Sequence, residues 1–274
     1  MTEQRSGIDE SKPSIARVYD YLLGGTDNFA VDREIGDFFL RDLPGSAAMA
    51  LANRQALVRA VGAMADAGVH QFIDMGSGLP TADNVHQVAR RHVPDARVAY
   101  IDHDPTVLAH GRALLAADER TALVEADLRE PESIRRHPEV QRLIDFDQPV
   151  GVIFSAILHH LNDTERPAAL ARWWVDRVPS GSLVYISHFR SGAGTGAEQE
   201  TRRAEQKLQQ SLGRGRWRTD EEILTLFDGL DLLEPGLVPC SLWRPDPTAT
   251  QVPTGEGDLS LWERLISCGL GRKP

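Results

Sequence analysis

Three residues near position 75 could form a ligand site at the end of a strand: Asp74, Gly76 and Gly78, in the stretch FIDMGSGLPTADNV. Glycines in such a turn let the backbone approach a ligand, and in dinucleotide-binding proteins they place a pyrophosphate at a helix N-terminus. Here a carboxylate two residues before the first glycine opposes a phosphate, and Thr81 replaces the third glycine of that motif. The stretch therefore favours a ligand that carries an ammonium group.

Two further carboxylates follow at the ends of the next predicted strands. Asp102 stands where the acid of a dinucleotide fold accepts hydrogen bonds from ribose hydroxyls, and Asp127 is placed to accept from an adenine amino group. Each acid alone fits a helix cap or a turn, but Asp74, Asp102 and Asp127 recur at three successive strand ends. S-adenosylmethionine carries an ammonium, a sulfonium, a ribose diol and an adenine, without a phosphate. This pattern predicts it as the cofactor.

The other cofactor contacts are predicted from their positions beside these acids. Ser155 and Ala156 end the fourth predicted strand beside the first, where backbone groups can meet the methionine part of the cofactor. His103 follows the ribose acid and is expected to pack on adenine or to face solvent. No metal ligand is expected. The residues predicted to contact the cofactor are Tyr21, Gly25, Asp74, Gly76, Ser77, Gly78, Asp102, His103, Asp127, Leu128 and Ser155.

A base for methyl transfer is sought among three histidines that follow the fourth and fifth strands. His159, His160 and His188 all lie on the predicted ligand edge, and histidine is the commonest general base. His159 is the first choice, against the alternative that each is a capping or core histidine. A carboxylate or thiolate acceptor needs no base.

The N-terminal stretch YDYLLGGTDNF combines apolar residues with polar tips. One interpretation is a helix that packs on the sheet edge and stops at Gly24. The other is a lid that closes over the cofactor and brings Tyr19 or Tyr21 near the methyl group. In that case Asp27 or Asn28 lies at the methionine end. The sequence leaves both open.

The elements that must position these residues alternate between strands and helices. An N-terminal helical extension is predicted before the first strand, and the alternation after it predicts a doubly wound, mostly parallel sheet. Helices are predicted over 14–23, 31–40, 47–67, 81–92, 163–176 and 197–212, and a further helix after the second strand has Pro105 in its first turn. Strands are predicted over 69–74, 96–102, 121–127, 149–156 and 182–189, with a sixth in 231–243 interrupted at Pro235-Gly236 and a last one near the C-terminus. The predicted parts are a disordered tail (1–13), the helical extension or lid (14–67) and a Rossmann-like domain (68–274).

The bulk composition narrows the classes of function. A net charge of −10 argues against a protein that grips nucleic acid with its whole surface. Two cysteines are too few for a disulfide framework or a four-cysteine zinc site. The polar N-terminus shows no secretory signal, and no apolar run reaches the ~20 residues that cross a bilayer. A cytoplasmic location is the expectation.

The chain resembles a bacterial S-adenosylmethionine-dependent methyltransferase family long catalogued as a domain of unknown function. The resemblance spans nearly the whole chain. It is carried by ARVYDYLLGGTDNFAVDR, FIDMGSGLPTADNVHQVA, YIDHDP, ADLREP, LHHLND, FDGLDLLEPGLVP and the closing GRKP. It implies a class I methyltransferase fold with seven strands, the seventh antiparallel beside the fifth. Leu79-Pro80 departs from the glycine-richer turn of methyltransferases in general. The resemblance implies no substrate.

The predicted function is methylation of a small molecule at oxygen or nitrogen. A non-catalytic or regulatory protein that binds S-adenosylmethionine is the alternative. An NAD-dependent oxidoreductase is disfavoured by Asp74 and Thr81, and a nucleic-acid methyltransferase by the acidic balance and by the absence of an N-P-P-Y-like run after the fourth strand. The expected partner is a small-molecule substrate of unknown identity, with a homodimer left open and no membrane partner.

Overall fold

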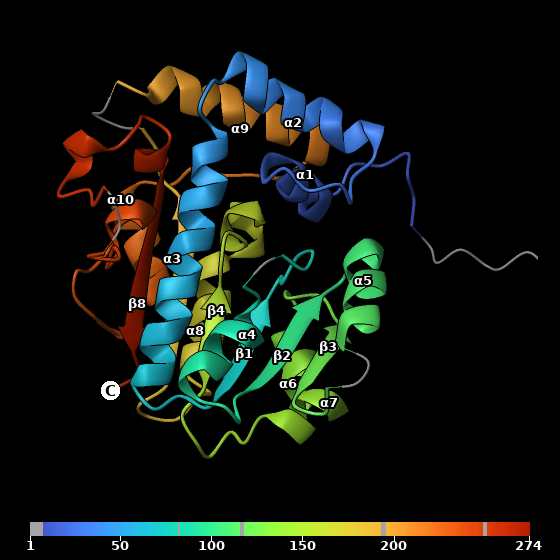
Figure 1. The fold of residues 1–274 in the computed structure, drawn as a ribbon, viewed down its shortest axis with the longest axis vertical. Helices are drawn as coiled ribbons and strands as arrows, with labels where there is room; N and C mark the ends of the chain where they lie inside the picture. The colour runs from blue at the N-terminus through green and yellow to red at the C-terminus, as the bar shows by residue number, and fades with distance from the viewer. Residues whose placement is uncertain (1–7, 82, 116–117, 193–195, 249–250) are drawn as a thin grey trace, which may run out of the picture.

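A mixed β-sheet forms the centre of the computed structural model, which describes residues 8–81, 83–115, 118–192, 196–248 and 251–274 (Figure 1). The strand order is β3-β2-β1-β4-β5-β8-β6, with β7 paired to β8. Strands β1 to β5 run parallel, and β8 is antiparallel to β5. The strands are β1 (Gln71–Met75), β2 (Arg97–Asp102), β3 (Thr121–Glu125), β4 (Gly151–Phe154), β5 (Leu183–Phe189), β6 (Asp231–Leu232), β7 (Val238–Pro239) and β8 (Ile266–Arg272).

The doubly wound sheet and its antiparallel last strand beside the fifth are confirmed, with one difference in strand count. The predicted sixth strand is divided into the two-residue strands β6 and β7, so the described sheet has eight strands. Pro235 cannot donate a ladder hydrogen bond, and Gly236 has a left-handed φ of +86°. The chain therefore leaves the sheet at this point and returns to it.

Helices α1 to α3 precede the first strand in the chain, and the other helices lie between the strands that follow. Two short helices, α6 and α7, lie between β3 and β4 and were not predicted from the sequence. Among the described residues, no helix combines the length and apolar character needed to cross a membrane. The helices are α1 (Ile15–Leu22), α2 (Ala30–Asp42), α3 (Ala47–Asp66), α4 (Val85–His92), α5 (Pro105–Leu115), α6 (Pro131–Arg136), α7 (Pro138–Leu143), α8 (Pro167–Val175), α9 (Glu198–Leu212) and α10 (Asp220–Leu224).

The core lies on both faces of the sheet because the parallel strands carry buried apolar residues on both faces. Successive residues of β1 point to opposite faces. Phe72 packs in one cluster with α3 and α4, while Ile73 packs in the other with α8. Ala56 and Ala60 are fully buried and let α3 approach the sheet closely. One end of this long helix lies near the edge where the parallel strands end (Figure 1).

The N-terminal helices α1 and α2 pack together at that same edge (Figure 1). Inside the pair, Arg17 Nε lies 2.7 Å from Asp32 Oδ2, and both side chains are buried. The pair is also tied to the start of α5: Ser14 donates to the Asp104 carboxylate, and Arg17 donates to Thr106 Oγ1 at 3.1 Å. Part of the predicted disordered tail, 1–7, lies outside the described residues. The proposed division into parts and the lid role remain predictions.

Candidate functional site

The glycine turn after β1 has a backbone that only glycine adopts readily. Gly76 and Gly78 have left-handed φ values of +70° and +67°. A Cβ on Gly76 would lie 2.5 Å from the Ile157 side chain, so the turn is also closely packed there. The N–H of Gly76 donates to the Ile101 carbonyl at 2.8 Å. The turn is thereby fixed to the end of β2.

Asp102 ends β2, and its carboxylate binds the surrounding backbone. It accepts from the N–H groups of Gly78 at 2.9 Å, His103 at 2.8 Å and Asp104 at 3.0 Å. A carboxylate has about four acceptor positions, so room remains for about one further donor, such as one ribose hydroxyl. Burial raises the pKa of Asp102. The predicted ribose acid is therefore also the residue that shapes the turn.

Asp74 is a buried carboxylate that accepts no hydrogen bond from the described residues, although the Arg54 guanidinium lies in the same cavity. Its exposed fraction is 5%, and no hydrogen-bond donor from the described part of the chain reaches it. Burial raises its pKa to about 7; Arg54 lowers this pKa and Asp102 raises it. Asp74 lines a cavity of about 30 Å³ together with Arg54, Tyr100 and His86. An ammonium group would supply the missing partner, so this residue fits the predicted cofactor.

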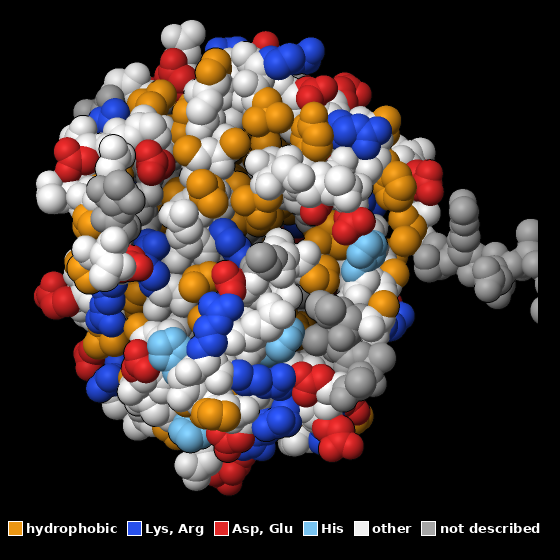
Figure 2. All heavy atoms as spheres, in the orientation of Figure 1, with side chains coloured by type: hydrophobic (Ala, Val, Ile, Leu, Met, Phe, Trp, Pro, Cys, Tyr) orange, Lys and Arg blue, Asp and Glu red, His pale blue; other side chains and the backbone are white. Residues whose placement is uncertain are grey.

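Arg54 is a residue of this cavity that the sequence interpretation missed. It projects from α3, and its Nη2 donates to the Asp83 carbonyl at 2.6 Å in the loop before α4. Its guanidinium carries the charge opposite to that of the Asp74 carboxylate, so the cavity is lined by both a cation and an anion. Figure 2 shows the surface hollowed between the N-terminal helices and the segment that precedes α4. The zwitterionic end of an amino acid matches this arrangement of charges.

Asp127 follows β3, but its carboxylate already has a partner. Arg129 Nε lies 2.9 Å and 3.0 Å from its two oxygens, and Arg129 Nη1 donates to Glu165 at 2.8 Å. The Arg129 side chain lowers the pKa of Asp127. His103 is exposed nearby, whereas Leu128 is buried in the core. This geometry gives little support to Asp127 as a free acceptor for adenine.

Ser155 follows β4 at the predicted methionine end and contacts a second residue that the sequence interpretation missed. Asn53 of α3 donates from Nδ2 to Ser155 Oγ at 3.2 Å. Asn53 is adjacent to Arg54, and its exposed fraction is 2%. Two neighbouring polar residues in an alanine-rich helix were the available signal. Helix α3 therefore contributes polar groups as well as packing to this edge.

The contacts of Tyr21 and Gly25 lie within the N-terminal helices and the loop between them. The Tyr21 hydroxyl donates to Asp37 Oδ1 at 2.8 Å, and the ring packs on Gly36, so this side chain stays within the α1–α2 pair. Gly25 lies against the Asp20 carboxylate, where a Cβ would approach to 2.0 Å. No hydrogen bond among the described residues joins either predicted cofactor contact to the β1 turn. The structure places Tyr19 closer to the strand ends, because the Tyr19 hydroxyl accepts from Asn53 at 3.0 Å.

His159, the predicted base, is packed inside the protein. Its ring stacks on Phe189 with centroids 3.5 Å apart, and its Nδ1 accepts from the Phe189 N–H at 3.2 Å. The neutral ring therefore carries its proton on Nε2 and has no free basic nitrogen. Burial lowers the pKa of His159 well below its usual value. This environment is that of a core histidine and leaves the catalytic prediction without geometric support.

The other two histidines are equally buried. His188 Nε2 lies 2.8 Å from Arg218 Nη1, which can only donate, while His188 Nδ1 lies 2.8 Å from the Phe189 carbonyl. Burial lowers the pKa of His188 and of His160 to about 3. Both are therefore neutral at pH 7. His160 is buried in the turn that follows β4, and His188 is buried near the end of β5.

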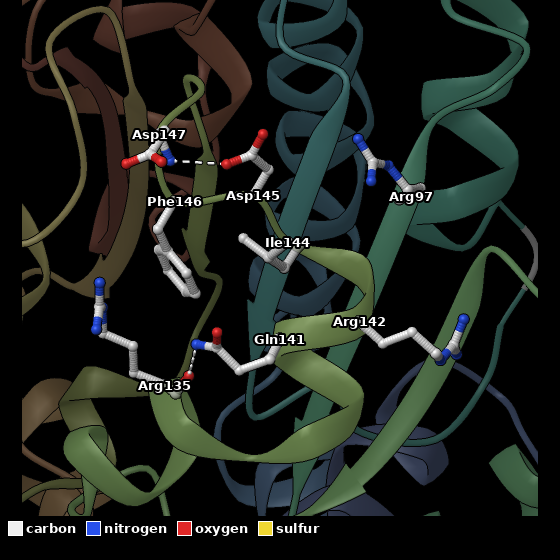
Figure 3. Close-up of a pocket in the computed structure, with 8 residues that line it drawn as sticks. All are labelled: Arg97, Arg135, Gln141, Arg142, Ile144, Asp145, Phe146 and Asp147. Atoms are coloured by element: carbon white, nitrogen blue, oxygen red, sulfur yellow. Dashed lines mark hydrogen bonds between the residues drawn. The ribbon is translucent and has the colours of Figure 1, made fainter.

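A larger cavity of about 410 Å³ lies at the opposite edge of the sheet (Figure 3). It is formed where β2 begins and before β4 begins, whereas ligands of open α/β sheets bind at the carboxyl ends of strands. Figure 3 shows its arginine side chains pointing in different directions. Arg142 pairs with Glu139 at 2.7 Å, and Arg135 lies over the Phe146 ring. The lining residues are Arg97, Arg135, Gln141, Arg142, Ile144, Asp145, Phe146 and Asp147.

Comparison with known proteins identifies relatives of similar length. A family model described as S-adenosyl methyltransferase matches residues 1–274. The crystal structure of a candidate methyltransferase from Thermobifida fusca is 43% identical, with a TM-score of 0.90, and the match covers 100% of this chain and 99% of that one. A DUF574 family protein from Streptomyces avermitilis is 35% identical, with a TM-score of 0.89 and coverage of 97% and 99%.

A more distant structure supports the fold alone. An O-methyltransferase family protein from Burkholderia thailandensis is 17% identical, with a TM-score of 0.54, and the match covers 88% of this chain and 62% of that one. A comparison with curated proteins gives no match. The resemblance stated from the sequence is confirmed by the family model and the two similar crystal structures. The chain therefore belongs to the S-adenosyl methyltransferase family, and S-adenosylmethionine is its cofactor.

Proposed function

We propose that this protein is an enzyme that methylates a small molecule at an oxygen or nitrogen atom. The observation that carries the proposal is the buried Asp74 carboxylate, which has no donor from the described residues beside a turn that needs glycine. A buried charge without a partner is costly, so such a group is retained where a ligand supplies the partner. Bound S-adenosylmethionine supplies a methyl group made electrophilic by a positively charged sulfur.

In this proposal each acid keeps a separate task. Asp74 accepts from the ammonium, and Arg54 beside it attracts the carboxylate of the methionine part. Asp102 accepts from one ribose hydroxyl through its remaining acceptor position. The Ser155 hydroxyl borders the methionine end. These residues orient the reacting methyl group, and positioning alone can contribute up to ~7–11 kcal/mol to a barrier.

A specific observation also favours a second candidate, a protein that binds the cofactor without catalysis. None of the three described histidines past β4 and β5 offers a basic nitrogen that is both accessible and matched to neutral pH. A hydroxyl acceptor usually needs such a base. The enzyme therefore requires an acceptor that is already nucleophilic, or a base outside this group of histidines.

Two measurements test the proposal. Calorimetry with the purified protein is expected to show binding of S-adenosylhomocysteine and no binding of NAD. Comparable NAD binding without S-adenosylhomocysteine binding would contradict the site. Release of S-adenosylhomocysteine during incubation with S-adenosylmethionine and a metabolite extract would then separate an enzyme from a regulatory binder. A cytoplasmic location and a small-molecule partner are further proposals from composition.

A further inference from the structure

Asn53 connects three separate parts of the structure through one buried amide group. Its Nδ2 donates to the Tyr19 hydroxyl of α1 at 3.0 Å and to Ser155 Oγ after β4 at 3.2 Å. Its Oδ1 accepts from Ser187 Oγ of β5 at 2.5 Å. The donors and the acceptor of this amide are therefore all engaged. A buried polar network of this kind specifies one arrangement, because a missing member leaves costly unpaired groups.

The Ser187 contact extends the network to the backbone at the end of β4. Ser187 Oγ accepts from the Ala156 N–H at 2.8 Å. Ala156 has a φ of +52°, a left-handed conformation that is unfavourable for a residue with a Cβ. The chain Asn53–Ser187–Ala156 therefore holds the strand end in a backbone shape that it would not adopt by itself. In the proposed function this is the edge that meets the methionine part of the cofactor.

The Tyr19 contact extends the network to the N-terminal helices. Tyr19 also donates to the Ala50 carbonyl of α3 at 3.0 Å, so its hydroxyl holds α1 against α3. On the other side of α1, Ser14 and Arg17 contact the start of α5. Residues 14–29, which we name the N-terminal segment, are thus attached to α3 through Tyr19 and to the start of α5 through Ser14 and Arg17. The α3 side of this attachment runs through Asn53, which also touches the β4 end.

We propose that Asn53 is a positioning residue that couples docking of the N-terminal segment to binding of the cofactor at the β4 end. A ligand that stabilises Ser155 and Ala156 stabilises the Asn53 amide, which in turn holds Tyr19 and α1. The coupling is reciprocal, so docking of the segment raises cofactor affinity by the same factor. This inference rests on the proposed function, because it requires the methionine part to lie at the end of β4.

Three variants test the coupling by calorimetry with S-adenosylhomocysteine. Asn53→Ala removes the whole connection and is expected to weaken binding about tenfold. Tyr19→Phe removes one hydroxyl and is expected to weaken binding about threefold. Tyr21→Phe is the matched control, because it removes the same hydroxyl from the same helix where the partner is Asp37. The control is expected to bind like the unmodified protein.

Hydrogen exchange supplies a readout that a purely structural role would not move. Saturating S-adenosylhomocysteine is expected to protect amides in 17–29 in the unmodified protein and in Tyr21→Phe. In Asn53→Ala the protein still binds at high ligand concentration, but this protection is expected to disappear. If Asn53→Ala does not fold, Tyr19→Phe tests the coupling instead. In that variant the ligand-induced protection of amides in 17–29 should be smaller than in the unmodified protein.

The possible failures are distinct. An unmodified protein that does not bind S-adenosylhomocysteine contradicts the proposed function itself. An unmodified protein that binds, with Asn53→Ala and Tyr19→Phe matching the control in both affinity and protection, overturns only the coupling.

Discussion

The backbone N–H of Gly78 donates a hydrogen bond to the Asp102 carboxylate at 2.9 Å. One side chain at the end of β2 therefore holds the glycine turn that follows β1. Two further N–H groups, from His103 and Asp104, approach the same carboxylate. The Asp102 side chain thus contributes both to the geometry of the turn and to the proposed ribose contact.

Replacing Asp102 by alanine is expected to weaken S-adenosylhomocysteine binding by about 1–3 kcal/mol, because charge-assisted hydrogen bonds are lost. Asp102→Asn should lose less, since the amide oxygen still accepts. Calorimetry measures both affinities, and circular dichroism establishes that the fold is intact. A folded alanine variant with unchanged affinity would make Asp102 a turn residue only.

Asp74 gives cofactor binding a pH dependence. Its pKa is raised to about 7 from a reference of 3.8. Since ammonium binding needs the carboxylate, affinity for S-adenosylhomocysteine is expected to rise as the pH rises through about 7, and Asp74→Asn should bind weakly without this rise. Calorimetry between about pH 6 and about pH 7.5 measures it. An equal rise in the asparagine variant would assign the dependence to another group.

The same carboxyl also affects the stability of the ligand-free protein. Between pH 3.8 and about 7 the folded state retains a proton that the unfolded state releases. Stability from this group is therefore present below that window and is lost as the pH rises through about 7. Asp74→Asn should remove this loss, so at about pH 8 the variant should be more stable in urea than the unmodified protein. A variant less stable at that pH would contradict the argument.

The buried pair of Arg17 and Asp32 makes the N-terminal helices sensitive to substitution. Arg17→Met leaves the Asp32 carboxylate, which is fully buried, without its cation. The free energy of unfolding is expected to fall by about 3–5 kcal/mol, measured with denaturant. Arg33→Met is the control, since Arg33 makes only partly buried contacts to Asn28. Equal losses in the two variants would argue against a special role for the buried pair.

His159→Phe separates a structural role from a catalytic one. The variant keeps an aromatic ring against Phe189 but loses the acceptor for the Phe189 N–H. The melting temperature is expected to fall by about 2–4 °C, while the pH profile of any turnover found with the extract should not change. Loss of turnover at unchanged stability would restore His159 as the base.

The sheet could be predicted because its strands are short apolar runs separated by helices and turn residues. The ends of β2 and β5 were placed correctly, since Asp102 and Phe189 terminate those runs. The interruption at Pro235-Gly236 was predicted, but the sequence did not show that it divides this segment into two strands, β6 and β7, which both pair with β8. Helices α6 and α7 were missed because each spans only six residues and carries a weak apolar period.

The site was predicted in part, because sequence spacing reports local chemistry and not tertiary partners. The position of Asp74 before a glycine turn is local, and so is Asp102 at a strand end. The Arg129 fork on Asp127 depends on side-chain direction, which spacing does not determine. Asn53 reaches the site only because α3 crosses to the strand ends. Such contacts arise from packing between distant segments.

The Asn53 network also constrains how the chain acquires its structure during synthesis. Ser187 follows Asn53 by 134 positions, and Asp104 follows Ser14 by 90. Helices α1 to α3 therefore emerge from the ribosome long before partners such as Asp104 and Ser187 are synthesised, while apolar residues such as Val18 and Met64 are not yet buried. Contacts of such high sequence separation slow folding and prolong exposure to aggregation. Nascent chains that stop before β5 should depend on chaperones, and that dependence should end once β5 has left the exit tunnel.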